Sequence, residues 1–200
     1  MISHRNALFL LALCLSPLVA APTAEAGKRP PVSTVVDDAL AVAATDRARA
    51  ITMLESELSQ SEGDATLRAR IALNLGEQLR LSGEGARAKA WFERALAEDA
   101  AGVGPAARLG LALLTPAASP SAPELNSVAD KDALPTQNAD RWLLLAAAAH
   151  QRGDADALRD ATRKALSHAA ADAAVLQRVE ASLSALAKGV SPTLPGLDSP

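Results

Sequence analysis

The 200-residue sequence is poor in the residues that build sheets and crosslinks: it has two Trp, two Phe, no Tyr and one Cys. Strands would find few aromatic partners here, whereas the alanine and leucine that dominate the 49% apolar content favour helix. A lone cysteine, Cys14, excludes an internal disulfide, so stability must come from packing. We therefore expect a single all-α domain.

Blocks of one charge sign are also missing. The formal net charge is -3, and acids and bases alternate along the chain. The sequence therefore has no cluster of basic residues of the kind that binds nucleic acid. We therefore expect no nucleic-acid binding. The signal-peptide pattern of residues 1–26 also predicts no stable insertion in a membrane.

Motifs for chemistry are equally scarce. After the N-terminal segment only His150 and His168 could serve as imidazole ligands, and no Cys, H-E-x-x-H or acidic calcium loop accompanies them. The stretch 83–88 matches G-x-G-x-x-A but follows a helical pattern instead of a strand, so we interpret it as a turn. The paired acids Asp37–Asp38 and Glu98–Asp99 suit helix surfaces and ends. We expect no catalytic residue, no metal and no cofactor.

Residues 1–26 have the pattern of a cleavable signal peptide. His4 and Arg5 precede the apolar run Ala7–Leu15, and Ala24-Glu25-Ala26 offers a small-x-small cleavage site. About 20 apolar residues are needed to span a bilayer, and Pro17 interrupts this run well before that. We predict that the mature chain begins at Gly27 and is periplasmic or secreted.

A lipoprotein is the alternative, because Cys14 lies inside this segment. Lipoprotein signals resemble Leu-small-small-Cys, whereas the bulky Leu13 directly precedes this cysteine, so lipidation is the less favoured outcome. Residues 27–34, which include Pro30 and Pro31, are expected to be extended.

From residue 35 onward, apolar residues recur at helical spacing. A first helix over 35–43 and a second over 47–58 form a hairpin, and Asp46 and Asp64 are expected to cap the helices that follow them. A third helix ends at Ser82–Gly83, and a fourth spans 86–98. The repeated unit is helix, tight turn, helix.

The dipeptide Leu75-Gly76 recurs 34 residues later as Leu109-Gly110. Residues 69–102 resemble a tetratricopeptide repeat, with Leu75, Gly76 and Leu79 at the family's Leu, Gly and Tyr positions. Ala88 and Phe92 stand at its Ala and Phe positions. In such a repeat small residues let the two helices cross closely, and Phe92 is expected to fill the space beside them.

Residues 139–172 resemble a second copy, with Trp142 at the family's Trp position and Gly153 in the turn. Between the copies, residues 103–138 form a repeat whose second half is a partly ordered, Pro/Ser-rich insertion at about 115–138, in which residues 124–133 could form a short helix before Pro135. A capping helix starts at Asp172 and ends at Gly189, and residues 189–200 are expected to be a disordered tail. The predicted fold is a right-handed, tetratricopeptide-like solenoid of about three repeats over residues 35–188.

The resemblance implies an adaptor or scaffold of the cell envelope that binds a segment of a partner protein in the groove lined by the first helix of each repeat. The implied partner-binding residues are Arg70, Leu73, Glu77, Arg80, Ala107, Leu111, Leu114, Leu143, Ala147 and His150. Alternatively, the insertion or the tail covers these leucines. Two other functions stay open: a self-associating structural protein of the envelope, and an accessory subunit of an envelope enzyme complex.

The cleavage site makes a testable prediction. Protein recovered from cells that express the full sequence should have the intact mass of a chain beginning at Gly27, without lipid. An intact mass that includes Cys14 with acyl chains would contradict both the cleavage and the localisation.

Overall fold

The chain is all-helical, as its composition predicts. A computed structural model describes residues 32–99, 101–115 and 123–196, so the predicted signal peptide lies outside the described residues. In these ranges there is no β-strand, and no helix is long and apolar enough to cross a membrane. The helices are α1 (Val32–Ala43), α2 (Arg47–Gln60), α3 (Ala65–Leu81), α4 (Gly85–Glu98), α5 (Gly104–Leu113), α6 (Pro123–Ser127), α7 (Pro135–Arg152), α8 (Ala155–Ala169) and α9 (Ala173–Leu186), with a 3-10 turn at Asp130–Asp132.

Local sequence sets most of the helix ends. Three helices begin at an aspartate whose side chain accepts a main-chain hydrogen bond: Asp46 before α2, Asp64 before α3 and Asp172 before α9. This confirms the predicted caps Asp46 and Asp64, and the predicted start of the last helix at Asp172. Gly83 and Gly153 follow α3 and α7 with φ of 84° and 70°, a left-handed conformation that glycine adopts without strain.

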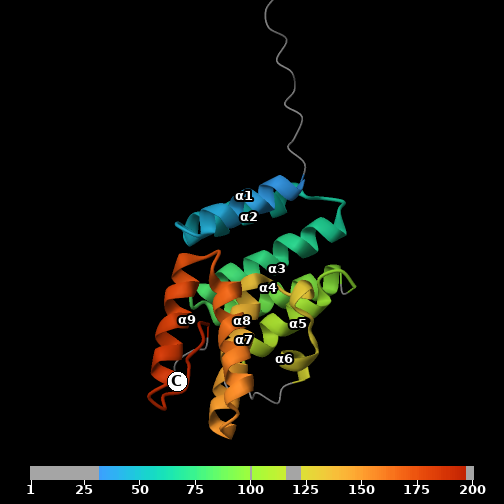
Figure 1. Cartoon of the computed structure of the whole chain (residues 1–200). Coiled ribbons are helices and arrows are strands. Elements are labelled where there is room, and N and C mark those ends of the chain that lie inside the picture. The colour runs from blue at the N-terminus through green and yellow to red at the C-terminus, as the bar shows by residue number, and fades with distance from the viewer. Residues whose placement is uncertain (1–31, 100, 116–122, 197–200) are drawn as a thin grey trace, which may run out of the picture.

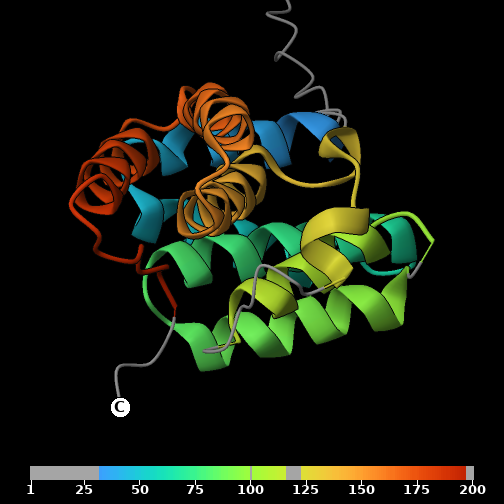
Figure 2. The same ribbon diagram turned by 60° about the horizontal axis from the view of Figure 1, so that its bottom comes forward.

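The helices pack as a series of neighbours in two groups. The hairpin α1–α2 lies over α3, and α3 packs against α4 and α5 (Figure 1). Helices α7, α8 and α9 pack on one another and run steeply across the direction of the first group (Figures 1 and 2). Helix α5 contacts α7 and so joins the two groups.

Phe92 of α4 is the central packing residue of the first group. Its ring is fully buried, as predicted, and it lies against two glycines from different helices. A Cβ on Gly76 of α3 would come within 2.8 Å of the ring, and a Cβ on Gly110 of α5 within 2.5 Å. The glycines of the two Leu-Gly dipeptides therefore meet one shared ring.

Two predicted boundaries need correction. Helix α1 begins at Val32, so residues 32–34 are helical and not extended. The last residues of the predicted insertion, from Pro135, belong to α7. The short helix expected over residues 124–133 is present as α6 and the 3-10 turn. Residues 116–122 lie outside the described residues.

The C-terminal segment is not a disordered tail over its described part. Leu194 is buried among leucines of α5, α6 and α7, and Gly196 lies so close to α4 that a Cβ on Gly85 would overlap its carbonyl oxygen. The segment is held because Leu194 and Gly196 fit against helices that were distant in sequence. Residues 197–200 lie outside the described residues.

The shared ring predicts the effect of two substitutions. Phe92→Ala should lower the free energy of unfolding by about 3–5 kcal/mol, because it leaves a cavity between three helices. Gly110→Ala should also destabilise, although alanine is favoured over glycine by about 1 kcal/mol in an open helix, because the new methyl group overlaps the ring. Urea unfolding measures both, with the exposed Glu93→Ala as control. A stabilised Gly110→Ala variant would mean that the three helices do not meet as described.

Candidate functional site

An open groove runs between α1, α3 and the segment 131–136 that leads into α7. It consists of two adjoining cavities of about 380 and 230 Å³, and Leu40, Asn74 and Leu134 line both. We call it the α1–α3 groove. Its remaining lining residues are Val36, Asp37, Ala43, Ala44, Thr66, Arg70, Leu73, Glu77, Gln78, Asp99, Gly102, Val103, Ala106, Lys131, Asp132, Ala133, Pro135, Thr136, Ala171 and Asp172.

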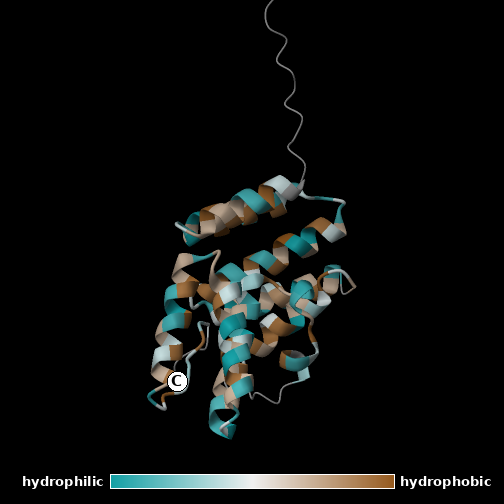
Figure 3. Cartoon of the chain, viewed as in Figure 1, coloured by the Kyte–Doolittle hydropathy of each residue, from teal (hydrophilic) through white to brown (hydrophobic). Residues whose placement is uncertain are grey.

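The α1–α3 groove is apolar inside and charged at its rim. Leu40 is 36% exposed although it is a large apolar residue, and hydrophobic residues run along much of α1 (Figure 3). The rim carries exposed charges of both signs: Asp37 and Asp132 are acidic, and Arg70 and Lys131 are basic. A surface of this kind suits a ligand with an apolar part and little net charge.

Three of the ten predicted partner-binding residues lie in this groove: Arg70, Leu73 and Glu77. Arg80 comes from the same helix but is fully buried among charged residues described below. The other six lie outside the groove: Ala107, Leu143 and Ala147 are buried in the core, Leu111 and Leu114 are half-buried, and His150 is exposed near the end of α7.

A single groove along α3, α5 and α7 is therefore absent from the described chain, and this prediction needs correction. Leu143 packs with Leu194 of the C-terminal segment, and Ala147 packs with Leu186 of α9. A Cβ on Gly196 would lie 2.9 Å from Leu114. The alternative in which the tail covers part of this surface thus holds for Leu114 and Leu143.

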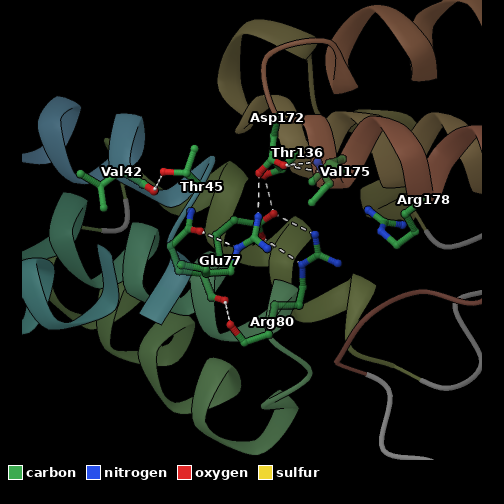
Figure 4. Close-up of polar contacts among 12 residues, drawn as sticks. Val42, Thr45, Glu77, Arg80, Thr136, Asp172, Val175 and Arg178 are labelled. Atoms are coloured by element: carbon green, nitrogen blue, oxygen red, sulfur yellow. Dashed lines mark hydrogen bonds and ion pairs between the residues drawn. The ribbon is translucent and has the colours of Figure 1, made fainter. Parts of the chain in front are cut away.

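A buried ion cluster joins α3 to the second group of helices (Figure 4). Nε and Nη2 of Arg80 donate to the two carboxylate oxygens of Glu77 at 2.9 and 2.8 Å. Its Nη1 lies 2.8 Å from Oδ2 of Asp140 in α7, and Oδ1 of Asp140 lies 2.6 Å from Nη2 of Arg178 in α9. The hydroxyl group of Thr136 donates to Glu77. The four charges alternate in sign and sum to zero, which allows Glu77, Arg80 and Asp140 to be buried, while Arg178 remains 24% exposed.

A second polar contact joins the N-terminal hairpin to the last helix. Arg47 at the start of α2 donates from Nε to Gln78 of α3 at 3.0 Å, and from Nη2 to Asp172 at 2.6 Å. Asp172 is also the cap of α9, so one carboxylate fixes both a helix end and a contact across 125 residues of chain. This contact and the ion cluster hold the two groups together on one side of the α1–α3 groove.

Asp130 holds the inserted segment against the second group. It accepts a hydrogen bond from Nε1 of Trp142 at 3.0 Å and one from Arg141, and it lies 3.3 Å from Nε2 of His168. Arg141 also donates to the carbonyl oxygen of Val128. These contacts position the segment that leads to Leu134 at the edge of the α1–α3 groove, so we interpret His168 as a structural residue.

Sequence reasoning missed several residues that shape the groove. Val36 and Leu40 fall within the helix predicted over residues 35–43, but nothing local indicates that α1 lies over α3 and leaves Leu40 exposed. Asn74 did carry a signal, because it is an amide within the apolar stretch that contains Leu73 and Leu75.

The ion cluster predicts how stability depends on pH. Burial raises the pKa of Glu77, but the charge of Arg80 and the hydrogen bonds from Arg80 and Thr136 outweigh burial and lower the pKa below its ordinary value. A carboxyl whose pKa is lower in the folded state stabilises the fold above its ordinary pKa, near pH 4.3, and this contribution is lost as the pH falls.

Glu77→Gln should therefore cost about 1.5–3 kcal/mol of unfolding free energy at pH 7, and progressively less as the pH falls from about 4 through the lowered pKa of Glu77. Chemical unfolding across this pH range measures the difference, and Glu62→Gln, at an exposed position, serves as the control. A Glu77→Gln cost that does not shrink in acid would contradict the charged state of Glu77.

Comparison of the chain with protein-family models, with curated proteins and with solved structures found no match. The α1–α3 groove, the ion cluster and the sequence pattern are therefore the observations from which function is argued.

Proposed function

We propose that the chain is a non-catalytic adaptor that binds a segment of a partner protein in the α1–α3 groove. The observation that carries this proposal is the groove itself: an elongated, open depression with an apolar interior that the chain's own described helices leave uncovered. Leu40 at its mouth is one of two large apolar side chains exposed in the described residues; the other is Val190. Apolar surface of this kind is typical of a protein-binding site.

The proposed fold is a short, tetratricopeptide-like solenoid that has closed upon itself. Two observations support the repeat. The Leu-Gly dipeptides lie 34 residues apart. Their glycines, Gly76 and Gly110, both pack against the ring of Phe92. In this proposal the ion cluster and the C-terminal segment occupy the part of the inner face near Arg80 and Leu143. Binding is then confined to the N-terminal part, beneath α1.

The proposed location is the cell envelope or the exterior, reached through a cleaved signal peptide over residues 1–26. Its support is the sequence pattern alone: a short polar start, an apolar run and the small-x-small site before Gly27.

Site-specific photo-crosslinking in cells tests the adaptor function. A photoreactive amino acid replaces Leu40 in the groove or, as the matched control, Val190, which is also apolar and 57% exposed but lies outside it. We expect ultraviolet light to produce a conjugate with a partner protein from position 40 and not from position 190.

Two results would contradict the adaptor function. The same conjugates from both positions would mean that contact with the groove is non-specific. A conjugate from position 40 with twice the mass of the chain would instead support the self-associating structural protein. As a further control, Leu40→Asp combined with a photoreactive residue at the neighbouring Asp37 should abolish the partner conjugate, because a buried charge in the apolar interior opposes binding.

A further inference from the structure

The C-terminal segment 190–196 follows a non-helical course from the end of α9 to the start of α4 (Figure 2). Leu194 and Gly196 are buried, whereas Ser191 and Thr193 are exposed. Residues that alternate between burial and solvent are typical of an extended peptide in a binding site, where every second side chain enters a pocket. The segment thus meets the helices as a bound peptide does.

Two residues anchor the segment. Leu194 lies in an apolar cluster of leucines from three helices: Leu109, Leu113, Leu125, Leu143 and Leu144. Gly196 has a φ of 81°, and a Cβ on it would lie 3.0 Å from Cγ of Arg80 and 2.9 Å from the side chain of Leu114. Any other residue would be strained and crowded there, so this position favours glycine. The two anchors define the pattern leucine, any residue, glycine.

The start of α4 leaves room for the segment. A Cβ on Gly85 would overlap the carbonyl oxygen of Gly196, and the three atoms nearest to such a Cβ all belong to Gly196. Gly85 is not among the glycines with positive φ, so the backbone of α4 does not itself require glycine at this position. The missing side chain of Gly85 therefore serves the passage of the segment.

Apart from its two anchors the segment is loosely attached. No main-chain hydrogen bond joins residues 191–196 to the helices in the described chain, and the last one before them runs from the N–H of Val190 to the carbonyl oxygen of Ala185 at 3.0 Å. A cavity of about 480 Å³ lies between α9 and the segment, with Arg178 and Ser182 on the side of the helix. Burial of one leucine favours the attached state by about ten- to a hundredfold, so the segment detaches without unfolding of the helices.

We propose that the leucine cluster and the start of α4 form a second peptide-binding site, which the chain's own segment 190–196 occupies as a displaceable ligand. The site recognises an extended segment of a partner protein that carries leucine and, two positions later, glycine. The chain's own segment competes with such a partner, so the site is self-inhibited. The described lining residues of the α1–α3 groove and of the cavity beside the segment do not overlap, so this inference goes beyond the proposed function.

A synthetic peptide with the sequence of residues 190–196, Val-Ser-Pro-Thr-Leu-Pro-Gly, acetylated and amidated at its ends, tests the site. It is titrated into the protein recovered from cells that express the full sequence with Leu194→Ser, which releases the chain's own segment. Binding is followed by NMR, and a peptide with aspartate in place of leucine is the matched control.

The expected affinity follows from the tether. A short flexible tether gives a millimolar effective concentration, so a ten- to hundredfold preference for the attached state predicts a dissociation constant below about 1 mM for the added peptide. The unchanged chain should bind the same peptide at least about tenfold more weakly, because its own segment competes. The aspartate peptide should not bind, because it would bury a charge among leucines.

Gly85→Ala tests the site from the side of the helix. In the otherwise unchanged chain the new methyl group overlaps Gly196, so the methyl resonances of Leu194 should move to the values of an unstructured peptide, with no loss of helicity by circular dichroism. Combined with Leu194→Ser, the change should weaken binding of the added peptide at least about tenfold. Gly104→Ala is the control: Gly104 also begins a helix, and the atoms nearest to a Cβ there belong to the flexible end of Arg108.

Failure of the peptide to bind the Leu194→Ser chain, or equal binding of the two peptides, would overturn the inference, because the segment would then be structural packing alone. Loss of helicity in Gly85→Ala would overturn it as well, since the segment could not leave without unfolding, and so would Leu194 resonances that this variant leaves in place. A dimer of the unchanged chain that Gly85→Ala dissociates would identify the segment of a second copy as the occupant. If Leu194→Ser does not fold, the result with Gly85→Ala decides.

Discussion

The structure depends on the burial of one positive charge. Arg80 has no exposed surface, so its guanidinium group needs carboxylates as partners. Glu77 supplies one from the preceding turn of α3, but Asp140 supplies the other from α7, and Asp140 in turn contacts Arg178 of α9. Satisfying this charge therefore brings α7 and α9 of the second group to α3 of the first.

The packing around Phe92 acts together with the ion cluster. Phe92 sets the distances among α3, α4 and α5, because both Gly76 and Gly110 lack the side chain that would push the ring away. The ion cluster then sets where α7 and α9 lie against α3. An open space remains between α1, α3 and the segment held by Asp130, and this is the α1–α3 groove.

The features that could be predicted from sequence are local. Asp46 and Asp64 precede helices and cap them, Gly83 ends one, and the spacing of Gly76 and Phe92 identified a close helix crossing. Each of these depends on residues within about one repeat of one another.

The features that could not be predicted depend on distant partners. The resemblance to a tetratricopeptide repeat implied that Arg80 lines a groove, whereas its partner Asp140 lies 60 positions further along the chain and buries it. Leu194 looked like part of a polar, proline-rich end, yet it fills a gap among leucines of α5 to α7. Asn74 is the intermediate case: its polarity inside an apolar stretch is visible in the sequence, but its place in the lining of the α1–α3 groove depends on α1 and Leu134, which are distant in sequence.

The contact between Arg80 and Asp140 can be measured directly by a double-mutant cycle on the free energy of unfolding, with Arg80→Met, Asp140→Leu and the double variant. Each single change leaves the buried cluster with one charge in excess and should cost about 3–5 kcal/mol. The double variant should cost less than the sum of the two by at least about 1.5 kcal/mol. If the two costs add to within about 0.5 kcal/mol, the residues do not interact, and the closure of α7 onto α3 is not held as described.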